Sequence, residues 1–143
     1  MPKENISIKY IKYLGDVKPL DDFVDSNGRS DEELLQAVIK FYEKSSKQIG
    51  KERTEIYRKI LNVTPKSVTI GKMHGRWGSC SSNKEITYNY LIATLPMDLI
   101  DCIVVHELCH IYHMNHSRSF WRKVGSVMPD YKEKMERLNQ SVG

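Results

Sequence analysis

The sequence predicts an α+β fold with a long N-terminal helix, a small β-sheet, a buried helix and further C-terminal helices. Three observations favour this fold. Apolar residues keep a helical period from Leu34 to Leu61. A β-branched run, SVTIGKM at 67–73, precedes a second strand-like run, EITYNYLIATL at 85–95. After Pro96, the segment that contains Ile100 to Ile111 would be apolar on nearly every face of a helix, which is typical of a buried helix.

The composition predicts a single domain, 1–143, around one modest core. A net charge of +4 and a pI near 8.9 tolerate an anionic substrate, but no dense run of Lys and Arg indicates nucleic-acid binding. No apolar run approaches the roughly 20 residues of a membrane span. The three cysteines lack a framework spacing, which favours reduced thiols and a cytoplasmic location.

The first 30 residues carry the weakest signals. ISIKYIKYL, at 6–14, alternates apolar and polar side chains well enough for an edge strand. VKPLDDFVDSNGRSD, at 17–31, is rich in turn-forming residues and is predicted as a loop.

The long helix is expected to begin at Ser30 or Asp31, because either residue can cap the acidic first turn that follows. Its apolar period continues to about Asn62, and Gly50 is a place where it could kink. We expect this helix to serve as scaffold.

The central segment predicts a hairpin. Its two strands would be SVTIGKM and EITYNYLIATL, joined by the Gly/Ser-rich turn HGRWGSCSSN at 74–83. In the second strand, Ile86, Tyr88 and Tyr90 would share one face. After the buried helix that Pro96 opens, Ser117 can cap a short helix, SFWRKVGSVM, and YKEKMERLNQ predicts a charged terminal helix.

The stretch HELCHIYHMNH, at 106–116, contains four of the five histidines. His106 and His110 are four residues apart, so on a helix both imidazoles point the same way and can hold one zinc ion. Glu107 lies about 100° round from His106, where it can reach a metal-bound water without binding the metal. This is the HExxH pattern of zinc hydrolases, in which the glutamate is the catalytic base.

A catalytic zinc site usually has a third protein ligand. His113 lies on the same helical face, but seven residues from His106 correspond to about 10.5 Å of axial rise. Ligand nitrogens on one zinc lie only about 3.5 Å apart. The chain must therefore turn back after His110, which makes His116 the expected third ligand and leaves His113 near the rim. Cys109 points away from His110 and is not counted as a ligand.

Several linked motifs also resemble a known family. RWGSCSS, ITYNYLIATLP, VVHELCHIYHMNHS, FW and MPDY, which fall between residues 61 and 140, are similar to the YgjP-type metal-dependent hydrolases, a zincin-like group related to the WLM and SprT metallopeptidases. The resemblance implies zinc at His106, His110 and His116, with Glu107 catalytic. It also implies a zincin-like fold with a sheet of about three strands beside the metal helix.

Three further residues are candidates for binding substrate. Arg76 could bind a substrate anion or stabilise an oxyanion, or it could instead form a salt bridge that holds its turn. Tyr88 and Asn89 lie on a predicted strand that could be the sheet edge, where zincins pair with an extended peptide. Trp77, Phe120 and Trp121 are expected in the core.

The predicted function is a zinc-dependent hydrolase of the metallopeptidase type, in which one Zn²⁺ activates a water and Glu107 is the general base. Other divalent transition metals would also suit three imidazoles. One alternative is a nucleotide pyrophosphatase, acting for example on UTP at the same metal site, although no Gly-rich phosphate loop is present. Another is a non-catalytic zinc-binding module. The expected partner is a peptide, small-molecule or nucleotide substrate, and no membrane association is expected. The oligomeric state is not predicted.

Overall fold

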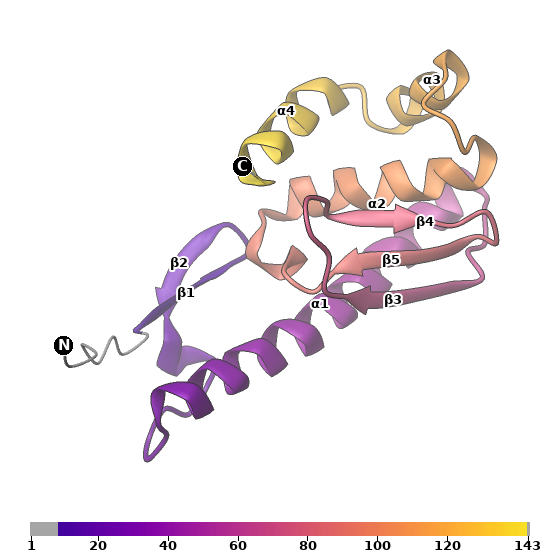
Figure 1. The fold of residues 1–143 in the computed structure, drawn as a ribbon. Helices are drawn as coiled ribbons and strands as arrows, with labels where there is room; N and C mark the ends of the chain where they lie inside the picture. Colours follow the sequence, from indigo (N-terminus) through magenta and orange to yellow (C-terminus); the bar gives the residue numbers. More distant parts are fainter. Residues whose placement is uncertain (1–8, 143) are drawn as a thin grey trace.

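A computed structural model describes residues 9–142. Residues 6–8 of the predicted edge strand at 6–14 lie outside the described residues. The chain has the predicted α+β composition. Helix α2, Met97–Tyr112, lies centrally, with the sheet on one side and helices α3 and α4 on the other (Figure 1). Helix α3 spans Arg118–Val127 and α4 spans Tyr131–Val142. Across the described residues, no helix combines the length and the apolar character that a bilayer crossing needs.

The N-terminal segment forms a hairpin where a strand and a loop were predicted. Strand β1, Tyr10–Tyr13, pairs antiparallel with β2, Asp16–Pro19. The expectation of a loop from residue 17 is therefore wrong for β2 and for the 3₁₀ turn η1, Leu20–Asp22. Leu14 and Gly15 make the turn with φ of 48° and 88°, the positive values of a type I′ turn. Sequence patterns miss such turns when leucine occupies the first of these positions.

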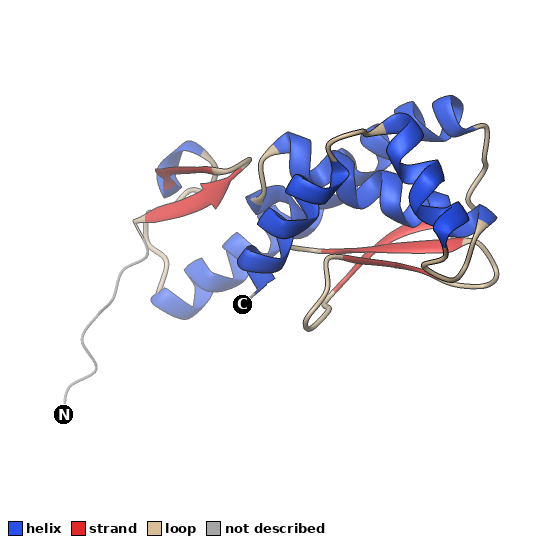
Figure 2. Ribbon diagram, turned by 90° about the horizontal axis from the view of Figure 1, so that it is seen from above, coloured by secondary structure: helices blue, strands red, loops and turns tan. Residues whose placement is uncertain are grey.

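The hairpin docks away from the three-stranded sheet (Figure 2). The N–H groups of Leu14 and Gly15 donate to the carbonyls of Ala93 and Thr94, at 2.7 and 2.9 Å. A Cβ on Gly15 would lie 2.8 Å from Pro96, so this close approach needs glycine. The hairpin thereby anchors the 3₁₀ turn η2, Ile92–Thr94, which leads into α2.

Helix α1, Asp31–Leu61, confirms the predicted long helix and both of its ends. Ser30 forms a capping box with Glu33, and Asn62 closes the helix in the left-handed conformation, at φ 56°. The helix is continuous at Gly50, where a Cβ would lie 3.1 Å from the Tyr88 ring. Gly50 is thus explained by close packing of α1 on the sheet.

The three-stranded sheet corrects the predicted hairpin. Its strand order is β3 (Ser67–Gly71), β5 (Glu85–Asn89) and β4 (Gly78–Cys80). Strands β3 and β5 are parallel, not antiparallel, and β4, which was predicted as turn, pairs antiparallel with β5. The prediction failed because GSC is too short and too rich in small residues to show strand periodicity; only its partner makes it a strand.

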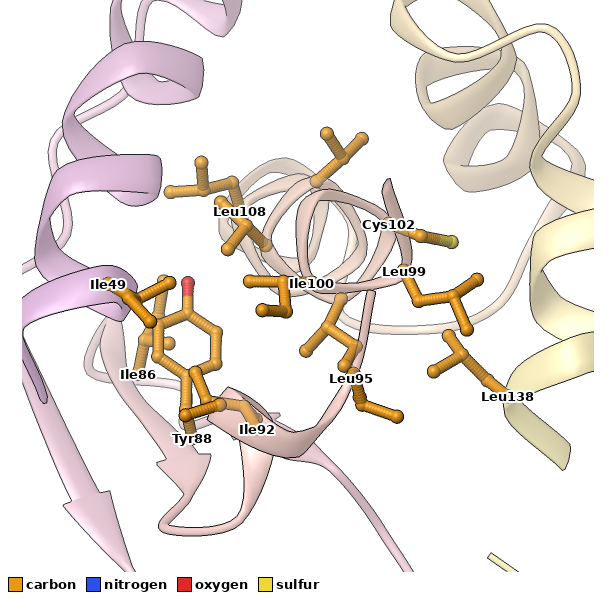
Figure 3. Packing of buried hydrophobic residues seen from close by; sticks show 14 of the residues in the cluster. Ile49, Ile86, Tyr88, Ile92, Leu95, Leu99, Ile100, Cys102, Leu108 and Leu138 are labelled. Atoms are coloured by element: carbon orange, nitrogen blue, oxygen red, sulfur yellow. The ribbon is translucent and has the colours of Figure 1, made fainter. Parts of the chain in front are cut away.

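The core surrounds α2. Viewed end-on, α2 has Ile49 of α1 and Tyr88 of β5 on one side and Leu138 of α4 on the other (Figure 3). Ile100, Val104, Val105 and Leu108 are fully buried, which confirms the helix that was predicted to be buried all round. Arg53 of α1 makes a bidentate salt bridge to Asp101 of α2, at 2.7 and 2.8 Å, and fixes the two helices to each other.

Candidate metal centre

Helix α2 ends soon after His110, as the convergence of a third histidine on His106 and His110 requires. Its last residue is Tyr112, and His113 is already extended, with φ −138° and ψ 102°. The chain then reverses, and His116 precedes Ser117, the residue that caps α3. The Nε2 atom of His116 lies 3.3 Å from Nε2 of His106 and 3.1 Å from Nε2 of His110.

These separations fit one metal ion. Imidazole nitrogens about 2.0–2.1 Å from a tetrahedral zinc lie roughly 3.4 Å apart. The three ring nitrogens lie within 4.8 Å of one another, and among the described residues this cluster contains no fourth His, Cys, Asp or Glu. Three donors with an open side are typical of catalytic zinc, whereas structural zinc sites are usually closed by four protein ligands. His106, His110 and His116 could therefore hold an ion with a free position.

The surroundings favour the neutral form of His106 and His110, which is the form that binds metals. Burial, together with the neighbouring His110 and His116, lowers the pKa of His106 to about 3. Burial likewise lowers the pKa of His110. Nδ1 of His110 lies 3.0 Å from the carbonyl oxygen of His113. If Nδ1 carries the proton and donates there, Nε2 is left with its lone pair toward the centre.

Two aromatic residues of α3 hold the imidazoles in place. Phe120, fully buried, stacks on His110 at 4.5 Å between ring centroids and meets His106 edge-on at 5.0 Å. Trp121 stacks on His116 at 5.5 Å. The expectation that Phe120 is a core residue is confirmed, but sequence reasoning missed that both rings pack directly on the proposed ligands. Their place just after His116 was the available signal.

The side chain of Glu107, a residue of α2, packs against β4. Only 6% of its surface is exposed, and a Cβ on Gly78 of β4 would come within 3.1 Å of its Cγ and 3.2 Å of its Oε2. Burial raises the pKa of Glu107 to about 8, against the opposing charge of Arg76. A bound cation would also oppose this rise. The carboxyl group is thus held in a tight, poorly hydrated position at the cavity that His106 also lines.

A cavity of about 180 Å³ opens beside Glu107 and His106. The loop before β4 and the first residue of the strand supply one wall through Arg76, Trp77 and Gly78, and α2 supplies the floor. The far wall belongs to α4, through Met135, Leu138 and Asn139. The sequence did not indicate that the charged terminal helix would face the site, because the approach of α4 to α2 depends on the turn at 128–130.

Arg76 lies at this cavity, as its predicted place beside the metal helix requires. Its side chain is exposed and makes no salt bridge within the described part of the chain. The turn is held instead by Asn89, whose Nδ2 donates to the carbonyls of Met73 and Arg76, both at 3.1 Å. Within the described residues, the Arg76 guanidinium therefore has no salt-bridge partner through which it could hold the turn.

The edge-strand interpretation of Tyr88 and Asn89 is wrong. Both lie on β5, which is the central strand and has neighbours on both sides. Tyr88 is fully buried, with its hydroxyl 2.8 Å from Thr54 Oγ1, and Asn89 is 7% exposed. The edge strand beside α2 is β4 (Figure 1). The error follows from the missed strand, since without β4 the second strand of a hairpin would have a free edge.

The nearby His113, Cys109 and Cys80 side chains do not belong to the ligand cluster. The His113 side chain is half-buried and outside the ligand cluster. Cys109 is fully buried, and burial raises the pKa of the Cys80 thiol to about 11, with the nearby Glu107 adding to the rise. Neither environment activates a thiolate.

Two comparisons with known proteins agree with this geometry. The model of a family described as YgjP-like, metallopeptidase domain, matches residues 12–141. The fold is similar to the crystal structure of the metallopeptidase zymogen of Pyrococcus abyssi abylysin, with a TM-score of 0.60 and 26% identity. That likeness covers 65% of this chain and 94% of the abylysin chain, and it confirms the expected zincin-like α+β fold. No curated protein matches the chain at a significant level.

Proposed function

The chain belongs to the YgjP-like metallopeptidase family, and on that premise we propose that it is a zinc-dependent peptidase. In this proposal His106, His110 and His116 hold one zinc ion and Glu107 is the general base. One observation carries it: three imidazole nitrogens converge, with separations of 3.1 and 3.3 Å at His116, beside a cavity that Glu107 also lines. Other divalent transition metals would suit the same donors.

The chemistry divides between the ion and the chain. A zinc ion in this site would lower the pKa of a bound water toward about 7 and polarise the peptide carbonyl. Glu107 accepts the proton of the attacking water and returns it to the leaving amine nitrogen. Its place directly after His106 on α2 puts the carboxylate at the cavity without adding it to the ligand set.

The protein around the ligands limits their movement. Phe120 and Trp121 pack on the imidazole faces, and the His113 carbonyl lies 3.0 Å from Nδ1 of His110, where it can accept a hydrogen bond that orients the ring. Such supporting contacts keep a metal site at its working geometry and typically change affinity or activity about 10–100-fold when they are removed.

Strand β4 supports a peptide as the substrate. It is an edge of the sheet, and it lies against Glu107 through Gly78. An extended peptide can add to such an edge through main-chain hydrogen bonds, which places its amide groups along the strand. The cavity that continues from β4 would then receive one substrate side chain next to the scissile bond.

The alternatives have less support. A nucleotide pyrophosphatase would use the same centre, with Arg76 as a phosphate ligand, but an edge strand offers nothing specific to a triphosphate. A non-catalytic zinc module is disfavoured because the described ligand cluster contains three histidines and no fourth donor.

The test is a turnover screen of the zinc-loaded protein against unstructured peptides and nucleoside triphosphates side by side. Metal-free protein, prepared by chelation, is the matched control for each substrate. We expect zinc-dependent peptide cleavage and no zinc-dependent release of pyrophosphate. Nucleotide turnover without peptide cleavage would contradict the proposal.

Arg76→Lys sharpens the screen, because lysine keeps the charge and loses the fork that grips a phosphate. We expect peptide cleavage within a few-fold of the parent. If a triphosphate were the substrate, loss of the fork would reduce turnover by about a hundredfold. Thermal melting of the variant, measured first, checks that the turn is intact.

A further inference from the structure

A second hollow adjoins the metal centre, between α3 and α4, and we call it the α3–α4 groove. Its volume is about 840 Å³, ample for a side chain or a short peptide segment. Its lining combines two aromatic rings with several charged side chains: Arg118, Trp121, Arg122, Tyr131, Lys132 and Glu136. The mechanism above uses none of the charged ones.

The aromatic part of the groove is ordered by packing. Trp121 of α3 stacks on Tyr131 of α4, with ring centroids 5.3 Å apart and planes 13° from parallel. Tyr131 also packs over Gly125, where a Cβ would lie in ordinary contact, 3.4 Å from Tyr131 Cε1. The two helices therefore present one continuous aromatic surface.

The charged part of the groove is positive. Arg118, Arg122 and Lys132 are exposed, and within the described residues no carboxylate lies at salt-bridge distance from any of them. Glu136 is the single carboxylate in the lining. Other nearby acids are already paired: Asp130 with Lys134 at 2.8 Å, and Glu133 with Arg137 at 3.6 Å. Three cations against one carboxylate give a field that attracts an anion.

The groove is continuous with the proposed metal site. The Trp121 ring that forms its wall also stacks on His116 at 5.5 Å and lies 5.7 Å from His106. Met135 and Asn139 line both the groove and the cavity beside Glu107. An extended chain rises about 3.3 Å per residue, so a side chain one to three residues from a peptide bond at the centre reaches the groove.

We propose that the α3–α4 groove binds an acidic side chain of the substrate, so that the enzyme prefers peptides with Asp or Glu within three residues of the scissile bond. This inference rests on the proposed peptidase function and names the class of peptide. The cations would pair with the carboxylate, and the Trp121–Tyr131 surface would pack on the methylene groups and backbone next to it.

The experiment uses matched fluorogenic peptides that carry Asp, Asn or Lys at each of the three positions on either side of the cleavage site. Zinc-loaded parent is compared with Arg118→Glu/Arg122→Glu and, as an independent change on the other helix, Lys132→Glu. The control is Lys51→Glu, which reverses an exposed lysine of α1 outside the groove.

At one position at least, we expect the parent to cleave the Asp peptide about three- to tenfold better than the Asn peptide in kcat/KM, mainly through KM. The double reversal should abolish that preference and favour Lys instead, whereas Lys51→Glu should leave it unchanged. Because the groove is exposed, the preference of the parent should weaken when salt is raised from about 0.05 to 0.5 M.

Binding separates this inference from the proposed function. Anisotropy of a labelled acidic peptide is measured on zinc-loaded Glu107→Gln, with and without the double reversal. Peptide cleavage with no acid preference at any position would overturn the groove assignment while leaving the peptidase intact. If no peptide is cleaved, the peptidase proposal fails; charge-dependent binding would still support the groove, and its absence would overturn it. Binding of a nucleoside triphosphate that displaces the peptide at lower concentration would also overturn the peptide assignment.

Discussion

The segment 106–121 and the strand β4 form two walls around the same centre, but the chain builds them differently. The first supplies three imidazoles, the carboxylate and the two rings that pack on them within one contiguous stretch. The second is three residues long and exists as a strand only through its pairing with β5. The reactive groups are therefore set by local spacing, while the surface proposed to receive substrate depends on distant partners.

This difference predicts how substitutions on the two walls should differ. Changes in the first wall should abolish metal binding or turnover outright, because each group there has its own chemical role. Changes in the second should alter the position of a neighbour and have graded effects. Changes in the buried contact between α1 and β5, away from both walls, should affect stability alone.

The largest effect is expected for His116→Ala. Loss of one of three ligands should remove the stoichiometric zinc, weakening affinity more than the roughly 10–100-fold that follows loss of a supporting contact. His113→Ala is the matched control, because its half-buried side chain lies outside the ligand cluster. Elemental analysis and chelator competition measure both variants. Zinc retained by His116→Ala and lost by His113→Ala would overturn the ligand assignment.

Glu107→Gln should separate metal binding from catalysis within the first wall. The amide keeps the shape of the side chain and removes its basicity, so zinc should stay at about one ion per chain while kcat falls about 10²–10⁴-fold. Elemental analysis and peptide turnover are measured on the same sample. Turnover within a few-fold of the parent would exclude Glu107 as the base.

Gly78→Ala tests the contact between the two walls. The added Cβ would lie 3.1 Å from Glu107 Cγ and 3.2 Å from Ile103 Cγ2, so the carboxylate must shift. We expect roughly a tenfold loss of kcat, since small displacements of catalytic groups cost up to about a hundredfold, with zinc retained. Gly71→Ala is the control: its Cβ would meet Thr87 at 3.3 Å in the same sheet, away from Glu107. Equal losses in both variants would indicate a general effect on the sheet.

The smallest effect is expected away from both walls, for Tyr88→Phe. This change removes the hydroxyl that lies 2.8 Å from Thr54 Oγ1 in the buried contact between α1 and β5. The free energy of unfolding should fall by about 1 kcal/mol, with peptide turnover unchanged. Chemical denaturation measures the first and the peptide assay the second. Tyr10→Phe is the control, because Tyr10 is 62% exposed. A selective loss of turnover would restore Tyr88 as a substrate residue.

Much of this protein could be predicted from residues close together in the chain. The cap expected at Ser30 or Asp31 and the apolar period that follows predicted α1 almost to the residue. The axial rise of a helix required a reversal after His110, and α2 does end at Tyr112. Helical structure depends on neighbours three and four positions away, so the sequence alone determined these elements and the spacing of the histidines they carry.

The substrate side of the centre depended on the tertiary structure. The parallel pairing of β3 with β5, the strand identity of Gly78–Cys80 and the approach of α4 to the cavity each join segments that are distant in sequence. Strand pairing and helix docking depend on packing between such segments, and neither segment shows a sequence periodicity that predicts its partner. Local sequence could therefore place the proposed catalytic groups, but only the folded arrangement showed which surfaces stand beside them.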